Sequence, residues 1–330
     1  MRSFAVRAGV CSGVLAFLLL PVAGGPAKAA PAGQDAMAAC DRQCLYGFLD
    51  QYLAALKAKD ASRLPLARHF RYSENNVAMK FPDGVWGTIT GMGDYVLRTA
   101  DPATGEAGAY GIVQETSASS IFALRLKVAD SKITEAEILV RRAGGDTGPF
   151  PSKPTLESNP VFEEIVPAAE RSPRERMIAL ADGYFSTLQL NDGAIFTQFY
   201  DDCDRWENGL LTTHNADLAK TIPTANLGCE QQFKLGNYRY DDRVRDRRFF
   251  LVDQERGLVM SAGFIDHAGR LENYTLTDGR AVTTPPAMRI PNTLCFLELF
   301  KVRGGKIQKI ESVFITVPYN MPSPWVEYQR

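Results

Sequence analysis

Apolar residues at helical spacing occur in two separate stretches of the chain. Around residues 45–56 they recur every three or four positions, which predicts a helix with one buried face. The stretch 178–188 has the same spacing, and a proline at position 173 suits the first turn of a helix. The pattern therefore predicts two amphipathic helices, one in each half of the chain.

A second pattern, alternation of apolar and polar side chains, follows each predicted helix. Segment 121–128 alternates, turns at polar residues and returns over 133–141. Segments 294–302 and 306–317 repeat the arrangement around a turn that contains two glycines. These patterns predict antiparallel hairpins. Helices followed by a long antiparallel sheet predict an α+β fold for each half.

The two halves also share individual residues in the same order. Residues of the first half recur in the second as follows: Asp50, Tyr52 and Leu56 as Asp182, Tyr184 and Leu188; Glu74 and Asn75 as Glu207 and Asn208; Lys127, Lys132 and Glu137 as Lys301, Lys306 and Glu311. The offset grows from 132 to 174 positions, which predicts a duplicated module with loop insertions in its second copy. We expect a first module at 40–143, a linker at 144–172, a second module at 173–320 and a C-terminal tail at 321–330.

The first 29 residues have the features of a secretory signal peptide. Two arginines precede an apolar run at 8–20, and an Ala-Lys-Ala motif ends at residue 29. The apolar run is too short for a comfortable membrane helix, and no later stretch is longer. We expect a periplasmic or secreted protein with no membrane span after cleavage of the signal.

Five cysteines follow the predicted signal peptide, and an oxidising compartment makes them disulfide candidates. Cys203 and Cys229 both lie in polar, turn-rich sequence and are expected to pair. Cys40 and Cys44 are close enough to bridge the start of a helix. Cys295 lies in an apolar strand and is expected to be a buried free thiol. Zinc is the alternative, but the chain has no C-x-x-C pair and only three histidines, so no metal is expected.

Composition and charge narrow the classes of function. The chain has 330 residues, 45% of them hydrophobic, and a formal net charge of −1, which is typical of a globular protein. This balance gives no electrostatic signature of nucleic-acid binding. The sequence contains no P-loop, no dinucleotide-binding glycine motif and no G-x-S-x-G elbow, so no cofactor is expected.

The runs RYSENN at 71–76 and FPDGVWG at 81–87, in this order of helices and sheet, resemble an exported subgroup of the nuclear-transport-factor-two-like superfamily. That superfamily includes ketosteroid isomerase, scytalone dehydratase and the SnoaL-like polyketide cyclases. The resemblance covers about 40–142 and 173–320. It implies two tandem cone-shaped modules, each with N-terminal helices packed on a curved sheet, that pair through their sheets as an intramolecular pseudo-dimer. A ligand pocket would lie between the helices and the concave face of the sheet.

The doubled Glu-Asn pair is the first candidate for chemistry in such a pocket. Glu207 and Asn208 offer a proton-transferring carboxyl beside a neutral hydrogen-bond donor, which suits enolisation, dehydration or β-elimination. Glu74 and Asn75 are their first-module equivalents. The alternative is that both pairs only tie the junction between helix and strand through backbone hydrogen bonds.

Other candidates surround the predicted insertions of the second module. His214 and His267 flank those insertions, and histidine is the natural acid–base group near neutral pH. A lone histidine is also often structural. Tyr184 and its equivalent Tyr52 could aim a hydroxyl into the cones, or could be core residues.

The basic run at 243–248 enters a predicted strand. In a regular strand Arg245, Arg247, Phe249 and Leu251 would share one face, and Arg248 would lie on the other. An arginine on the concave face, Arg248 or Arg205, could hold a carboxylate or sugar hydroxyls. The alternative is an ion-paired outer face of the sheet.

We therefore expect an exported, cofactor-independent lyase or isomerase that acts on a small oxygenated substrate, such as a sugar derivative or an aromatic compound. Glu207, His267 and His214 would move the proton, and Asn208, Arg205, Tyr184 and Arg248 would orient the substrate. The alternative is a non-catalytic periplasmic or secreted protein that binds a ligand or acts as a scaffold. A buried carboxylate or histidine with a shifted pKa would favour catalysis, whereas cones filled by Phe, Trp and Leu would favour the alternative.

Overall fold

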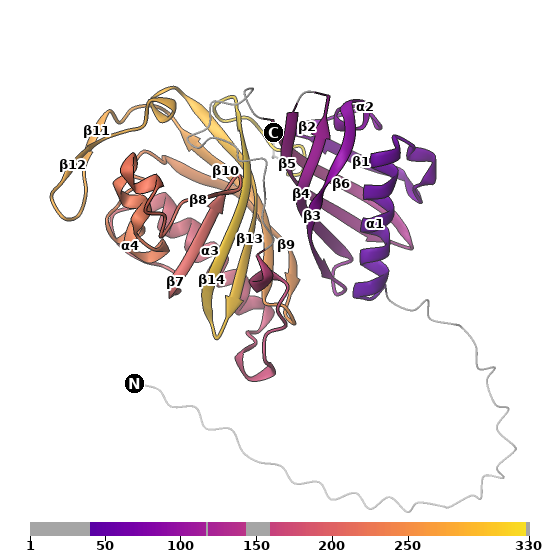
Figure 1. The fold of residues 1–330 in the computed structure, drawn as a ribbon, viewed down its shortest axis with the longest axis horizontal. Coiled ribbons are helices and arrows are strands. Elements are labelled where there is room, and N and C mark those ends of the chain that lie inside the picture. The colour runs from indigo at the N-terminus through magenta and orange to yellow at the C-terminus, as the bar shows by residue number, and fades with distance from the viewer. Residues whose placement is uncertain (1–39, 117, 143–158, 328–330) are drawn as a thin grey trace, which may run out of the picture. The chain divides into compact units, whose positions relative to one another are not determined.

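The computed structural model describes residues 40–116, 118–142 and 159–327 (Figure 1). The predicted signal peptide at 1–29 lies outside the described residues, as does the first half of the predicted linker. Within the described part of the chain, no helix is both long enough and apolar enough to cross a membrane.

The first module begins with helix α1 (Arg42–Ala58), whose start is capped by the Asp41 carboxylate accepting a hydrogen bond from the Cys44 amide at 2.9 Å. Leu45, Leu49 and Leu56 form its buried face, as the spacing predicted. They pack in one apolar cluster with residues of the sheet that follows. A short helix, α2 (Val85–Thr88), adds Trp86 to the same cluster.

The first sheet has six strands in the order β2-β1-β6-β5-β4-β3. They are β1 (Leu66–Glu74), β2 (Val77–Ala78), β3 (Ile89–Asp101), β4 (Glu106–Glu115), β5 (Ala118–Ala129) and β6 (Lys132–Arg141). Only β1 and β6 pair in parallel; the other neighbours are antiparallel. The predicted hairpin at 121–141 is confirmed as β5 and β6.

The second module repeats this topology. After helix α3 (Arg174–Leu190), its six-stranded sheet has the order β8-β7-β14-β13-β10-β9, and the pairing of β7 with β14 is again parallel. The strands are β7 (Phe199–Glu207), β8 (Leu210–Leu211), β9 (Arg243–Asp253), β10 (Leu258–His267), β13 (Asn292–Arg303) and β14 (Lys306–Val317). The predicted hairpin at 294–317 is confirmed as β13 and β14. Both halves are thus α+β, as expected.

Two insertions distinguish the second module from the first. One joins β8 to β9 and contains helix α4 (Cys229–Lys234). The other joins β10 to β13 and contains the hairpin of β11 (Asn273–Thr275) and β12 (Ala281–Thr283), which Figure 1 shows as a projecting loop. The equivalent first-module connection is short, because β4 ends at Glu115 and β5 begins at Ala118.

The predicted disulfides are both present. Cys203 on β7 is bonded to Cys229 at the start of α4, and Cys40 is bonded to Cys44. Cys295 is a buried free thiol, as expected. The bond from Cys203 ties the first insertion to the sheet.

Two expectations about local structure are wrong. Each module begins with one long helix, as the apolar spacing predicted, where the resemblance implied several N-terminal helices; the chain passes from α1 through a short 3-10 turn (Ala61–Arg63) directly into β1. The regular alternation expected over 245–251 is also broken, since the pairing of β9 with β10 shifts register twice and Asp246 has φ = 52°. As a result Phe249 packs against the core of the second module, whereas Leu251 belongs to a different cluster.

That different cluster contains residues of both sheets. Leu97, Tyr110 and Ile121 of the first sheet are buried with Leu251 and Leu297 of the second. An ion pair between Arg248 and Glu137, with Nη2 and Oε1 2.6 Å apart, also joins the modules. The two modules of this chain therefore share a buried apolar layer.

Candidate functional site

A small cavity lies in the second module, between α3 and the inner face of the sheet. We call it the inner cavity; its volume is about 40 Å³. It is large enough for water-sized groups. Its polar lining comes from separate elements: Tyr184 on α3, Arg205 and Glu207 on β7, Tyr238, Tyr240 and Asp241 in the first insertion, His267 on β10, Glu298 on β13 and Ser312 on β14.

Glu207, Ser312 and Glu298 form a row across three neighbouring strands. Ser312 on β14 is the register partner of Glu207 on β7 and of Glu298 on β13. Because neighbouring strands are about 4.8 Å apart, the Cα atoms of the two glutamates are separated by about 10 Å. All three residues line the inner cavity, so two carboxyl groups face the same small space.

Glu298 is kept protonated by its surroundings. Its side chain is almost fully buried, and burial together with the negative charge of Glu207 raises the pKa of Glu298 to about 8. The positive charge of Arg205 and a hydrogen bond with Tyr184 oppose this rise only in part. At neutral pH Glu298 is therefore mainly an acid that can donate a proton or a hydrogen bond.

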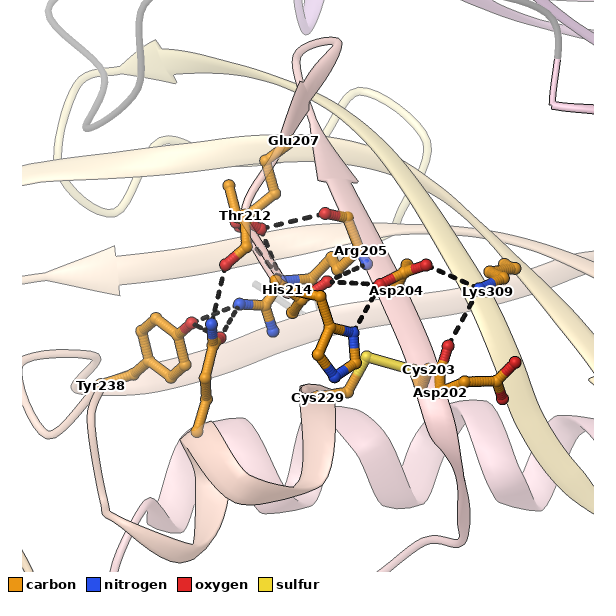
Figure 2. The surroundings of a disulfide bond; sticks show 12 residues. Asp202, Cys203, Asp204, Arg205, Glu207, Thr212, His214, Cys229, Tyr238 and Lys309 are labelled. Carbon is orange, nitrogen blue, oxygen red and sulfur yellow. Dashed lines mark hydrogen bonds and ion pairs between the residues drawn. A yellow bond between two sulfur atoms is a disulfide. The ribbon is translucent and has the colours of Figure 1, made fainter. Parts of the chain in front are cut away.

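Glu207, in contrast, has a fixed positive charge beside it. The Arg205 Nε lies 3.3 Å from Glu207 Oε2, and this oxygen accepts no hydrogen bond from any described residue. Arg205 is itself buried and donates from Nη2 to Gln232 Oε1 at 2.6 Å and to the Tyr238 hydroxyl. Figure 2 shows the guanidinium held between Tyr238 and the strand that carries Glu207. Burial disfavours its charge, yet Tyr238 and Glu207 raise the pKa of Arg205 well above its ordinary value, so it stays charged.

His267 and Asp241 form a second acid–base pair on the cavity wall. The His267 Nε2 lies 2.8 Å from Asp241 Oδ1, and both side chains are buried. Burial raises the pKa of Asp241, and the hydrogen bond with His267 opposes that rise. The other ring nitrogen of His267, Nδ1, is buried and has no hydrogen-bond partner among the described residues. The carboxylate therefore orients an imidazole that keeps one nitrogen available.

Four of the predicted site residues thus meet at one cavity: Glu207, His267, Arg205 and Tyr184. Burial raises the pKa of Tyr184 well above its ordinary value, so its hydroxyl stays neutral. The other predicted residues of the second module lie elsewhere.

Asn208 is a structural residue of the turn after β7. It adopts φ = 51°, and its side-chain oxygen accepts a hydrogen bond from the Phe314 amide at 3.0 Å. Asn75 holds the equivalent turn, since its side-chain oxygen accepts from the Val140 amide at 2.8 Å. Both asparagines therefore tie strand junctions through the backbone, which was the alternative interpretation.

His214 and Arg248 do not line the inner cavity. The His214 Nδ1 lies 2.7 Å from Asp204 Oδ1 on the outer side of β7, near the disulfide (Figure 2). Arg248 is directed to the first module by its ion pair with Glu137. Arg247, the residue before Arg248, bonds Asp182 and Ser186 of α3, so the two arginines lie on opposite faces of β9, as alternation predicts.

The first module has three equivalent positions on neighbouring strands, but only one of them carries a carboxyl group. Glu74 is the register partner of Ile138, and Ile138 is the partner of Leu124, so apolar residues stand where the second module has Ser312 and Glu298. Glu74 accepts hydrogen bonds from the Val85 amide at 2.6 Å and from Arg142 at 3.0 Å.

Tyr52, the equivalent of Tyr184, accepts a hydrogen bond from Trp86 Nε1 at 3.2 Å. Both are buried in an apolar cluster with Leu124 and Ile138. The space between helix and sheet is thus filled by packed side chains at these positions.

Sequence reasoning missed Glu298, Ser312 and Asp241. A signal for Glu298 was present, because it is the one charged residue in the apolar run LCFLELF at 294–300. Asp241 lies in an insertion without regular pattern, and Ser312 is inconspicuous in sequence. Within the described residues, no three His, Cys, Asp or Glu side chains are grouped in a way that could hold a metal ion.

Parts of the chain are similar to known proteins. Residues 170–314, most of the second module, match a family described as a domain of unknown function (DUF8021). No sequence among curated proteins matches significantly.

Solved structures are similar at low identity. A provisionally designated polyketide cyclase from Xanthomonas campestris is 17% identical, with 43% of this chain and 92% of that chain covered and a TM-score of 0.27. An NTF2-like protein from Cytophaga hutchinsonii is 13% identical, with 44% and 100% covered and a TM-score of 0.24. A protein with a cystatin-like fold from Caulobacter vibrioides is 14% identical, with 43% and 88% covered and a TM-score of 0.25.

Proposed function

We propose that the protein is an exported, cofactor-independent lyase or isomerase that transfers protons in the inner cavity of the second module. The observation that carries this proposal is the row of Glu207, Ser312 and Glu298, in which two carboxyl groups share one cavity under different electrostatic conditions. A buried carboxyl with a raised pKa, such as Glu298, is suited to act as the acid beside a second carboxyl in the same cavity.

In this proposal Glu207 is the base and Glu298 is the acid. Glu207 removes a proton from a carbon next to a carbonyl group, and the electron pair of that C–H bond moves towards the carbonyl oxygen. Glu298 donates a hydrogen bond or its proton to that oxygen, which stabilises the enolate or enol. For a dehydration, the same proton goes to the leaving hydroxyl group. Arg205 holds Glu207 in place, and Tyr184 holds Glu298.

His267 provides a further proton-transfer group in the lining of the inner cavity. Its position at the end of β10 is set by Asp241 from the first insertion, at 2.8 Å. In an isomerisation, a proton taken from one carbon must be returned at another, and a second acid–base group within the cavity serves that purpose. The insertion thus contributes Asp241, which the first module lacks.

The substrate is proposed to be a small oxygenated compound, such as a sugar derivative or an aromatic hydroxy-carbonyl compound. A cavity of about 40 Å³ admits only its reactive end. Burying ionisable groups costs stability. A purely structural role for this cavity gives no reason for the protein to bear that cost at its buried carboxyls. This consideration favours catalysis over the non-catalytic alternative.

Solvent deuterium exchange tests the function even where the product has not been identified. The purified protein is incubated in D₂O with a panel of hydroxy ketones, hydroxy aldehydes and aromatic ketones, and loss of the proton signal next to the carbonyl is followed by NMR. We expect catalysed exchange for at least one compound, with a loss of about 10²-fold or more in the Glu207→Gln variant.

Glu74→Gln is the matched control, because it makes the same change at the equivalent position of the first module. It should leave the exchange rate unchanged. If Glu207→Gln and Glu298→Gln both exchange at the wild-type rate on a compound that the wild type turns over, the assignment is wrong.

Export is supported by the two disulfides, because such bonds persist in oxidising compartments. Cell fractionation of the producing organism tests it: the mature chain should be found in the periplasmic or culture fraction and should begin after residue 29.

A further inference from the structure

The two insertions of the second module enclose a second pocket, which we call the outer pocket. Its volume is about 370 Å³, and it is lined by Leu218, Ile222 and Ala225 from the first insertion and by Tyr274 and Val282 from the second. This volume lies in the range of pockets that hold small molecules. Among the described residues of the first module, no elements equivalent to α4 or to the hairpin of β11 and β12 are present.

Four hydroxyl groups of the outer pocket have already used their donors. The Tyr274 hydroxyl donates to the Asn237 carbonyl at 2.6 Å, and the Tyr238 hydroxyl donates to Gln232 Oε1 at 2.5 Å. The hydroxyls of Thr221 and Thr283 also donate to groups of the protein. These groups therefore offer oxygen lone pairs and ring faces to a ligand, which suits a ligand that brings hydroxyl donors and an apolar ring.

Charge is nearly balanced at this pocket. The lining includes one charged side chain, Arg280, and its Nε lies 2.8 Å from Asp278 Oδ2 at the exposed end of the hairpin. An anionic ligand would have to compete with that carboxylate for the guanidinium. The pocket is thus suited to an uncharged molecule.

Tyr238 and Tyr240 line both the outer pocket and the inner cavity. The Tyr240 ring lies between the two spaces, with its centroid 6.0 Å from His267 on one side and 6.2 Å from Tyr274 on the other. The Tyr238 hydroxyl also accepts a hydrogen bond from Arg205. Two aromatic side chains therefore line both the outer pocket and the inner cavity at the boundary that the two spaces share.

We propose that the outer pocket binds the body of an uncharged, hydroxylated ring compound and presents its reactive end to the inner cavity past Tyr238 and Tyr240. Binding of the ring compound follows from the pocket alone, whereas presentation of its reactive end rests on the proposed function. The insertions of the second module are then a substrate-binding device that the duplicated copy acquired.

Binding of 2-naphthol, a neutral ring with one hydroxyl group, tests the proposal by isothermal titration calorimetry at pH 7. The anionic 2-naphthalenesulfonate has the same ring and is the matched probe. We expect saturable 2-naphthol binding and affinity for the sulfonate weaker by about tenfold or more, because its charge would have to be desolvated.

Val282→Trp and, separately, Thr221→Trp place an indole in the outer pocket, and each should weaken 2-naphthol binding by about tenfold or more. Ile290→Trp is the control, since Ile290 is 67% exposed and does not line the pocket. Circular dichroism verifies that each variant is folded. Wild-type affinity in both pocket variants, no binding to the wild type, or tighter binding of the sulfonate would each overturn the proposal.

Glu298→Gln separates this proposal from the proposed function. It should bind 2-naphthol with wild-type affinity, because Glu298 lines only the inner cavity. If this binding pattern is found without exchange activity, the outer pocket is supported as a binding site and the proposed catalytic function is contradicted. If Glu298→Gln abolishes binding in a folded protein, the probe occupies the inner cavity and the outer pocket is the part that fails.

Discussion

Arg42, the first residue of α1, donates two hydrogen bonds to Asp253, the last residue of β9 in the other module; the one from Nη2 to Oδ1 is 2.8 Å long. Arg174, the first residue of α3, makes the reciprocal contact, with Nη2 2.6 Å from Oδ2 of Asp101, the last residue of β3. Equivalent residues of the two copies thus contact each other in both directions. This is the pattern of a two-fold symmetric interface, here within one chain.

We expect Asp253→Asn to lower the free energy of unfolding by about 2 kcal/mol, because it removes one charge of a largely buried pair and weakens its charge-assisted hydrogen bonds. Urea unfolding of Asp253→Asn, Arg42→Gln and the double variant measures the coupling. A coupling energy above about 1 kcal/mol is expected, whereas additivity within about 0.5 kcal/mol would show that the pair makes no net contribution.

The pH profile of the proposed reaction follows from Glu298. Because its pKa is raised to about 8, the acid form is present below that pH and is lost above it. The rate of catalysed deuterium exchange under kcat/KM conditions should therefore fall as pH rises through about 8. In Glu298→Gln, whose amide donates a hydrogen bond at every pH, a slower reaction without this alkaline limb is expected. If the rate for Glu298→Gln still fell as pH rises through about 8, the fall would have to be assigned to another titrating group.

Glu311 on β14 predicts a pH dependence of stability. Burial raises its pKa from 4.5 to about 7, and its Oε1 accepts no hydrogen bond from the described residues. Between pH 4.5 and about 7, Glu311 is therefore protonated in the folded protein and ionised in the unfolded chain. The resulting stabilisation is complete below pH 4.5 and is lost as pH rises through about 7, a difference of about 3 kcal/mol.

Glu311→Gln should remove this dependence and should unfold at a higher urea concentration than the wild type at pH 8. Measurements at pH 5 and pH 8 suffice, with Glu115→Gln as a control for a carboxyl whose pKa is lowered, chiefly by Arg142 against the opposing effect of burial. An equal loss of stability with pH in the wild type and in Glu311→Gln would contradict the prediction.

The two disulfides should contribute unequally. Cys203 and Cys229 are separated by 26 positions, whereas Cys40 and Cys44 are separated by 4. Because a longer loop loses more entropy when closed, replacing the first pair by serine should cost about 3 kcal/mol, and replacing the second should cost less than about 2 kcal/mol. Limited proteolysis should then cut the first variant within 212–242. Equal unfolding midpoints for the two variants would contradict this.

Periodic pattern sufficed to predict helices α1 and α3 and the hairpins of β5 with β6 and of β13 with β14. Helix α1 buries one face, and the spacing of its apolar residues records that face directly. The strands of the hairpins are buried on both faces, with Phe296 in the core of the second module and Leu297 in the layer between the sheets. Cysteine context predicted both disulfides for a similar reason, since Cys203 and Cys229 lie in turn-rich sequence. The bulge at Asp246 was not predictable from alternation, because an extra residue in a strand does not interrupt its composition.

The site was only partly predictable. Glu207 was identified by its repetition and His267 by its place beside an insertion, and both line the inner cavity. Glu298 was missed because it has no acidic counterpart in the first copy, where Leu124 stands. Asp241 reaches His267 through a loop, and contacts made by loops depend on tertiary packing that no local pattern records.

The difference between Leu124 and Glu298 has a consequence for how such a protein can evolve. In a dimer of identical subunits, a substitution that buries a carboxyl occurs twice, and both sites bear its destabilising effect. Covalent joining of the copies removes that constraint, because Leu124 and Ile138 can keep one module apolar while Glu298 and Ser312 change the other. The first module can then keep its apolar interior, while the second module accommodates a buried carboxyl.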